Sequence, residues 1–130
     1  MNSARRPNAI PILRIGSTLL TSIQFELQDT IIDEFQDDLL QSLEKYSATG
    51  LIIDISALDN VDSYVARRLA DTGKMTKLMG ADTVIVGMRP EVSATLVRMG
   101  FSFQSLHTAL SLEEGLDLLK CIRRKKPGRR

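Results

Sequence analysis

The segment GLIIDISALDNVDSYVARRLADTGKM, residues Gly50–Met75, contains the pattern around which the rest of the chain is arranged. Residues 51–53 form an apolar run typical of a strand that is covered on both faces. The polar residues that follow, up to Asp62, predict a loop at the carboxyl end of that strand. Asp62 and Ser63 are both strong N-cap residues, and apolar residues then recur at helical spacing. We therefore expect a helix that begins at or near Ser63.

The flanking sequence predicts a mixed sheet with helices against it. Gly16-Ser17 suits a type II′ hairpin between the first two strands, and Pro11 places the first strand at a sheet edge. Further strands are predicted at 83–86 and 105–108, and further helices at about 30–46, 90–99 and 111–122, in addition to strands at 10–15 and 19–23. The order β-β-α-β-α-β-α-β-α predicts an α/β fold with a mixed, mostly parallel sheet of about five strands and four α-helices.

Each predicted helix carries an apolar stripe that we expect to face the core. In the first helix the stripe is Ile32, Phe35, Leu39, Leu43 and Tyr46, and in the third it is Val92, Leu96 and Met99. Ser111 and Glu114 have the spacing of a capping box at the start of the last helix.

Composition indicates one domain at residues 9–122, a disordered N-terminus at 1–8 and a basic disordered tail at 123–130. The net charge is +1, but residues 7–122 hold nine basic residues against 16 acidic ones. This balance argues against nucleic-acid binding by the domain. The tail RRKKPGRR could contact nucleic acid or anionic lipid, or serve only as a solubilising terminus. We find no signal peptide and no apolar run that could cross a membrane, so we expect a cytoplasmic protein.

Most enzyme classes lack their motifs in this chain, and we expect no catalytic activity, cofactor or metal. The single Cys121 and the single His107 exclude an intramolecular disulfide and a multi-histidine metal centre. There is no glycine-rich phosphate loop and no nucleophile elbow. His107 is expected to be structural rather than part of a triad. Asp54, Asp59 and Asp62 could hold a divalent cation, although their spacing within one loop favours solvated carboxylates.

Asp54 also suggests a different class of protein. An acid that ends a central strand is where a phospho-accepting receiver domain keeps its aspartate. Such a domain needs further acids after its first strand and a lysine near its last strand. Here Gly16-Ser17-Thr18 follows the first strand, and residues 105–111 contain no lysine. The receiver interpretation is therefore the weaker alternative.

Ser63 has two interpretations. The first is a plain helix cap, and the residues alone favour this interpretation. The Ser63 hydroxyl also lies beside unpaired backbone amides that can hold phosphate oxygens. A phosphate there would gain ~0.3–1 kcal/mol from the helix end, while repulsion from Asp59 and Asp62 would cost ~1 kcal/mol. Phosphorylation would thus change the surface without unfolding the domain.

The segment IDISALDNVDSYVARRLADTGKMTKLMGADTVIVGMRPEV resembles the STAS domain, the fold of bacterial anti-sigma factor antagonists. The resemblance continues through IPILRIGSTLLTSIQFEL upstream and TALSLEEGL downstream, and so covers roughly residues 9–122. Within that family, the chain is most similar to the single-domain RsbS type, and the similarity lies in the segments SIQFELQD, VDSYVA and KLMGA.

The resemblance implies a non-enzymatic scaffold that assembles with RsbR-type STAS paralogues into a stressosome, as homo- and hetero-oligomers. It implies an RsbT-type serine kinase as the sequestered partner and a PP2C-type phosphatase that resets the switch. By position, the phosphorylated residue is Ser63, and Asp59, Asn60, Asp62 and Tyr64 flank it on the surface that the kinase would read. We expect Arg67 to belong to the same kinase-docking surface.

The sequence departs from the family pattern at Arg67 and Arg68, where smaller or aliphatic residues are expected. Either arginine could pair with a phosphate on Ser63 or with acids of a partner, or be only solvated, and Arg67 lies one turn beyond Ser63 on the same helix face. A STAS module that binds a nucleotide or lipid remains a third alternative.

Overall fold

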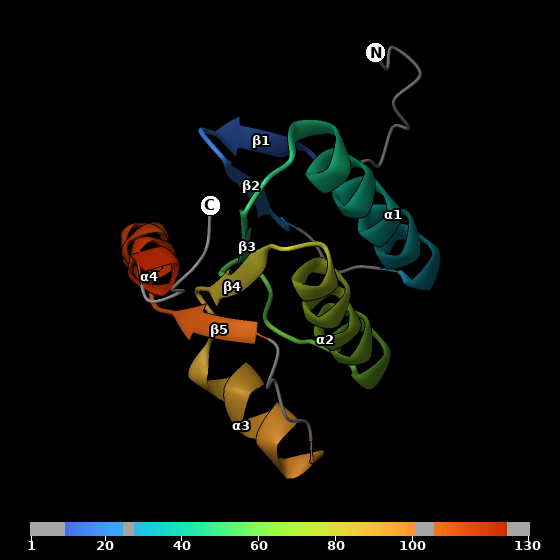
Figure 1. Cartoon of the computed structure of the whole chain (residues 1–130). Coiled ribbons are helices and arrows are strands. Elements are labelled where there is room, and N and C mark those ends of the chain that lie inside the picture. Colours follow the sequence, from blue (N-terminus) through green and yellow to red (C-terminus); the bar gives the residue numbers. More distant parts are fainter. Residues whose placement is uncertain (1–9, 25–27, 101–105, 125–130) are drawn as a thin grey trace.

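The computed structural model describes residues 10–24, 28–100 and 106–124 (Figure 1). Its elements, in chain order, are β1 (Ile12–Ile15), β2 (Thr18–Ser22), α1 (Asp29–Tyr46), β3 (Gly50–Asp54), α2 (Ser63–Leu78), β4 (Asp82–Val86), α3 (Pro90–Arg98), β5 (Leu106–Ala109) and α4 (Leu112–Arg124). The predicted order of strands and helices is confirmed, as is the start of the second helix at Ser63.

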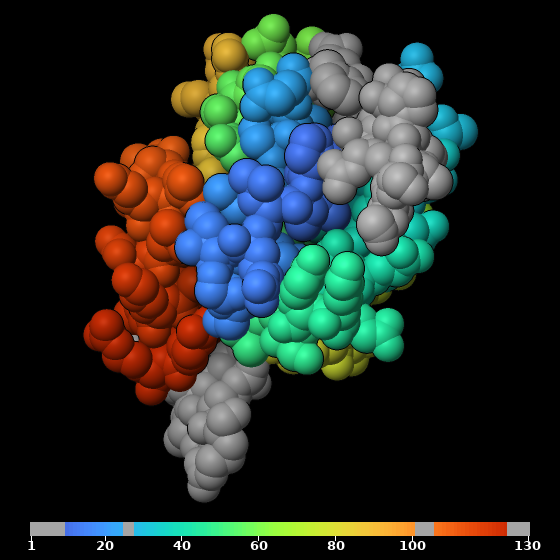
Figure 2. Space-filling model, turned by 90° about the horizontal axis from the view of Figure 1, so that it is seen from above, coloured from blue at the N-terminus to red at the C-terminus, as the bar shows by residue number. Residues whose placement is uncertain are grey.

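The strands form one five-stranded sheet in the order β1-β2-β3-β4-β5. β1 pairs antiparallel with β2, and every later neighbour is parallel. The backbone φ of Gly16 is +60° and that of Ser17 is not positive, as a type II′ hairpin requires. β1 is an edge strand, as Pro11 predicted, and Figure 2 shows it at the surface between α4 and α1.

Helices cover the sheet on both faces, and β3 lies between the two layers (Figure 1). Leu51 and Ile53 pack in the larger core with α1, α2 and α3, whereas Ile52 between them points to α4 and contacts the cluster around Leu119. All three side chains are fully buried. The prediction of a strand covered on both faces is therefore confirmed, because alternate side chains of a strand point to opposite faces of the sheet.

Two predicted core positions at helix ends are wrong. Tyr46 is 40% exposed, and its ring lies under the guanidinium of Arg14, with the charged carbon 4.7 Å from the ring centroid. Met99 is 43% exposed at the end of α3. In both cases the helix ends before a further layer can cover the last apolar residue.

The capping box of α4 is confirmed in part. The hydroxyl of Ser111 accepts from the Glu114 amide at 3.2 Å, but the Glu114 carboxylate accepts from the amide of Leu110. The helix continues through Arg124, two residues into the segment where we expected a tail. Arg123 donates from Nη2 to Oγ1 of Thr49 at 2.7 Å, which holds the end of α4 against the sheet. Residues 1–8 and 125–130 lie outside the described part of the chain.

Among the helices that the structure describes, none combines the length and the apolar character that crossing a membrane requires.

Candidate functional site

The loop between β3 and α2 is held in place at both ends. At its start, the amide of Ser56 donates to Oδ1 of Asp54 at 2.8 Å, and the amide of Ile55 donates to the carbonyl of Val86 on the neighbouring strand at 3.0 Å. Farther along, the side chains of Leu58 and Val61 are buried in the larger core. Because these apolar residues anchor the loop, the polar residues between them are displayed at a fixed place on the surface.

Ser63 is the first residue of α2 and is exposed. The N-cap is Asp62, whose Oδ1 accepts from the Val65 amide at 2.8 Å. The hydroxyl of Ser63 makes no hydrogen bond with any residue that the structure describes. The interpretation of Ser63 as the helix cap is therefore wrong, because the residue before it already fills that place. Its hydroxyl is not needed to begin the helix.

Asp59, Asn60, Asp62 and Arg67 are also exposed, as the predicted kinase-reading surface requires. Tyr64 differs from them: it is half-buried and its hydroxyl is bonded to α1.

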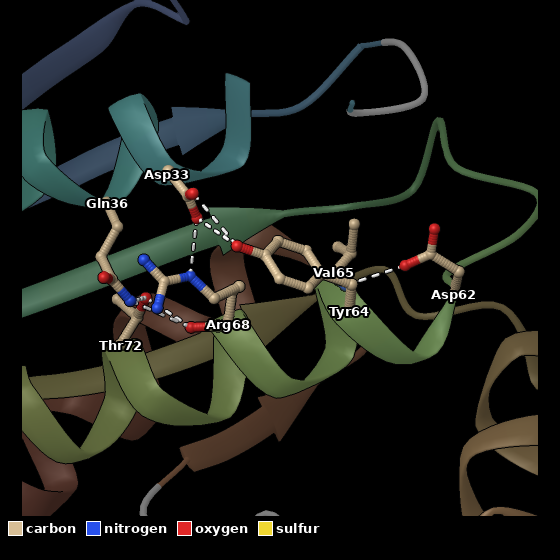
Figure 3. Close-up of polar contacts among 7 residues, drawn as sticks. All are labelled: Asp33, Gln36, Asp62, Tyr64, Val65, Arg68 and Thr72. Carbon is tan, nitrogen blue, oxygen red and sulfur yellow. Dashed lines mark hydrogen bonds and ion pairs between the residues drawn. The ribbon is translucent and has the colours of Figure 1, made fainter. Parts of the chain in front are cut away.

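A three-residue cluster joins the first two turns of α2 to α1 (Figure 3). The Tyr64 hydroxyl donates to Asp33 at 2.8 Å, and Nε of Arg68 lies 2.8 Å from the same Asp33 oxygen. The hydrogen bond to Asp33, which stabilises the neutral phenol, is the main reason why the pKa of Tyr64 is raised above its usual value of 10.0. Arg68 therefore has a partner within the chain, an acid of α1, in addition to the partners considered from the sequence.

Below this cluster, Gln36 of α1 bonds to the next turn of α2. Its amide nitrogen donates to the Thr72 hydroxyl at 2.9 Å and to the carbonyl of Arg68 at 3.3 Å (Figure 3). The Thr72 hydroxyl donates in turn to the same carbonyl at 2.7 Å. These contacts fix α2, and so Ser63 at its start, relative to α1.

Arg89, from the loop before α3, contacts the β3–α2 loop from the other side. Its Nε donates to the carbonyl of Ser56 at 3.2 Å, and its Nη1 lies 3.0 Å from Oδ1 of Asp59. Gly87, two residues earlier, has a φ of +77°, and a Cβ there would lie 2.7 Å from Cβ of Ser56. The two loops therefore meet at a position where only glycine leaves enough room.

Asp54 and His107 were the candidates for a receiver-like aspartate and for a triad histidine. Asp54 is half-buried and closes the turn at Ser56, while His107 is half-buried on β5. Within residues 10–24, 28–100 and 106–124, no three side chains of metal-ligand type gather to hold an ion. The other two carboxylates considered for a cation have partners within the chain. Asp59 contacts Arg89, and Asp62 caps α2.

The hairpin leading into parallel βα units is the arrangement expected from the family resemblance, and comparison with known proteins tests that expectation. Residues 9–115 match the model of the STAS domain. The chain belongs to the STAS domain family. Its fold superimposes on a serine-to-glutamate variant of RsbS from Moorella thermoacetica with a TM-score of 0.79 and 36% identity, over 88% of this chain and 97% of that one. A chain from a structure of the stressosome, described as a signal integration and transduction hub, gives a TM-score of 0.73 at 36% identity, covering 88% and 99%.

Similarity also extends to a longer protein of the same family. RsbRD of Bacillus subtilis, an RsbT co-antagonist, is 34% identical over 80 residues, which make up 62% of this chain. The match spans 29% of the length of that relative. This STAS chain therefore resembles RsbS proteins along nearly their whole length, and RsbR proteins in one part only.

Proposed function

We propose that this protein is a non-enzymatic scaffold and antagonist of the RsbS type, acting in cytoplasmic stress signalling. It assembles with RsbR-type STAS proteins into a stressosome and holds an RsbT-type serine kinase. Phosphorylation of Ser63 by that kinase releases it, and a PP2C-type phosphatase removes the phosphate. Coverage of almost the whole RsbS chain at 36% identity supports this role over that of an RsbR-type protein.

The observation that carries the proposal is the exposed Ser63 hydroxyl at the first position of α2. Because Asp62 caps the helix, Ser63 can take a phosphate without losing a bond that the helix needs. The first amides of an α-helix have no partners within the helix, and they favour a nearby anion. The serine is thus accessible to a kinase, and its modified form fits the local backbone.

The switch is local and electrostatic. A phosphate adds about −1.5 to −2 charge at this helix end. Stabilisation by the helix, ~0.3–1 kcal/mol, is close to the ~1 kcal/mol of repulsion from exposed carboxylates such as Asp62. The fold therefore stays intact while the surface around Ser63, with Asp59, Asn60 and Arg67, becomes strongly negative. A partner that docks on the neutral serine loses affinity for this surface.

The receiver-like alternative based on Asp54 fits the structure less well. Receiver-type folds are doubly wound with the strand order 2-1-3-4-5. Here the order is β1-β2-β3-β4-β5, with an antiparallel first strand. The Asp54 carboxylate also accepts from the Ser56 amide and so closes its own loop.

The test is phosphorylation by an RsbT-type kinase with ATP, followed by intact-mass measurement. The wild-type chain is expected to gain one phosphate that survives acid, and Ser63→Ala none. Ser93→Ala is the matched control, because Ser93 is also an exposed serine near a helix start, in α3. It should be phosphorylated as wild type. Phosphate on Ser63→Ala, or an acid-labile phosphate that is lost in Asp54→Asn, would refute the proposal.

A further inference from the structure

Arg89 is the one basic side chain seen to reach the loop that leads to Ser63 from a neighbouring loop of the described chain. It comes from the N-terminal boundary of α3, where its backbone forms the N-cap. Its side chain does not cap that helix and instead extends to the β3–α2 loop. An arginine has donors on both edges of a planar group, so one side chain can hold two acceptors at once.

The two acceptors of Arg89 lie within the loop's first turn and directly after it. One is the backbone carbonyl of Ser56, and the other is the carboxylate of Asp59. Between them, Leu58 is buried in the core and its amide donates to the carbonyl of Ile55 at 3.0 Å. Arg89 therefore fixes both the path of the backbone and the direction of one exposed acid, four residues before Ser63.

Gly87 allows the close approach between the β3–α2 loop and the loop before α3. A Cβ at position 87 would meet Cβ of Ser56 at 2.7 Å and Oδ1 of Asp54 at 3.1 Å. The absence of a side chain there lets the loop before α3 lie close enough for Arg89 to reach over. The side chain of Arg89 is 46% exposed and that of Asp59 is 72% exposed, so the pair lies at the surface.

We propose that Arg89 is a positioning residue for recognition of Ser63 by the serine kinase. The inference rests on the proposed function and adds a residue from outside the helix and loop that carry the serine. By holding Asp59 and the Ser56 carbonyl, Arg89 presents the loop to the kinase in one arrangement. Without it, the Asp59 carboxylate loses its partner and the kinase must fix its direction on binding, which costs affinity rather than the rate of the chemical step.

The test is steady-state kinetics of Ser63 phosphorylation with this protein as the substrate. Arg89→Ala is expected to raise KM roughly fivefold with kcat nearly unchanged, because the group acts on docking. Arg89→Lys, which can still approach Asp59 as a point charge, should recover part of the loss. Arg98→Ala removes another arginine of α3, at its other end, and should behave as wild type.

Hydrogen exchange of the amides at 56–60 supplies the readout that needs no kinase. We expect faster exchange in Arg89→Ala than in the wild type and in Arg98→Ala, with circular dichroism unchanged. Equal KM values for wild type and Arg89→Ala overturn the inference, even if exchange rises, since the contact would then be only structural. A wild-type chain that takes no phosphate on Ser63 overturns the proposed function itself and the inference with it.

Discussion

The hydroxyl of Tyr64 donates to Oδ1 of Asp33 at 2.8 Å, so the residue directly after Ser63 is bonded to a different helix. Asp33 lies in the first turns of α1, and Tyr64 in the first turn of α2. This contact and the ion pair of Asp33 with Arg68 fix the start of α2 relative to α1. A serine on a fixed helix start can change its charge without moving its surroundings, which is what a surface switch requires.

The bond to Asp33 has a consequence at high pH. Because it raises the pKa of Tyr64, the neutral phenol is favoured in the folded state more than in the unfolded state. The stability that this provides is fully present below the unfolded pKa of about 10 and is lost as pH rises through the folded pKa. Tyr64→Phe should therefore lose less stability than wild type above about pH 10 in urea unfolding.

The pKa itself is measurable, since the chain has two tyrosines and Tyr46→Phe leaves only Tyr64. Ultraviolet absorbance of the tyrosinate in this variant should titrate with a midpoint above about 10. Adding Asp33→Asn removes the carboxylate and should bring the midpoint back down. A midpoint that does not respond to Asp33→Asn would show that the contact is not maintained in solution.

Asp62 provides a second prediction, because it rather than Ser63 caps α2. Asp62→Ala should reduce the free energy of unfolding by about 1 kcal/mol, as lost N-caps do. Asp62→Asn keeps an oxygen acceptor and should be close to wild type, and Ser63→Ala should also cost little. If Ser63→Ala destabilises the protein as much as Asp62→Ala does, the assignment of the cap is wrong.

Gly87 and Gly80 form a matched pair for the approach of the two loops. Both have a positive φ, +77° and +87°, but a Cβ at Gly80 would meet nothing within 4 Å. Gly80→Ala should cost about 1 kcal/mol of backbone strain. Gly87→Ala adds a clash with Ser56 and should cost about 3 kcal/mol in urea unfolding. Equal costs for the two variants would mean that the loops do not meet closely.

Much of the fold could be predicted because its signals are local. The apolar run at Leu51–Ile53, the hairpin glycine Gly16 and the cap region at Asp62 each act within a few residues. The exposed end positions Tyr46 and Met99 were missed, because the spacing of apolar residues does not reveal where the covering layer stops.

The contacts that hold the site could not be predicted in the same way. Asp33 and Tyr64 are separated by 31 residues, and Ser56 and Arg89 by 33, so only the folded arrangement brings each pair together. The sequence did contain one signal, the unexpected arginine at position 68, but its partner could equally have been a phosphate or another protein. The choice between Asp62 and Ser63 as cap was open because both residue types serve well.

The affinity of the RsbT-type kinase for this protein, before and after phosphorylation of Ser63, tests the proposed switch most directly. Calorimetric titration should show binding to the unmodified chain and at least about tenfold weaker binding to the phosphorylated one, a difference of about 1.4 kcal/mol. The circular dichroism spectrum should be the same for both forms. Equal affinity for the two forms, or weaker binding accompanied by loss of the folded spectrum, would contradict a switch confined to the surface around Ser63.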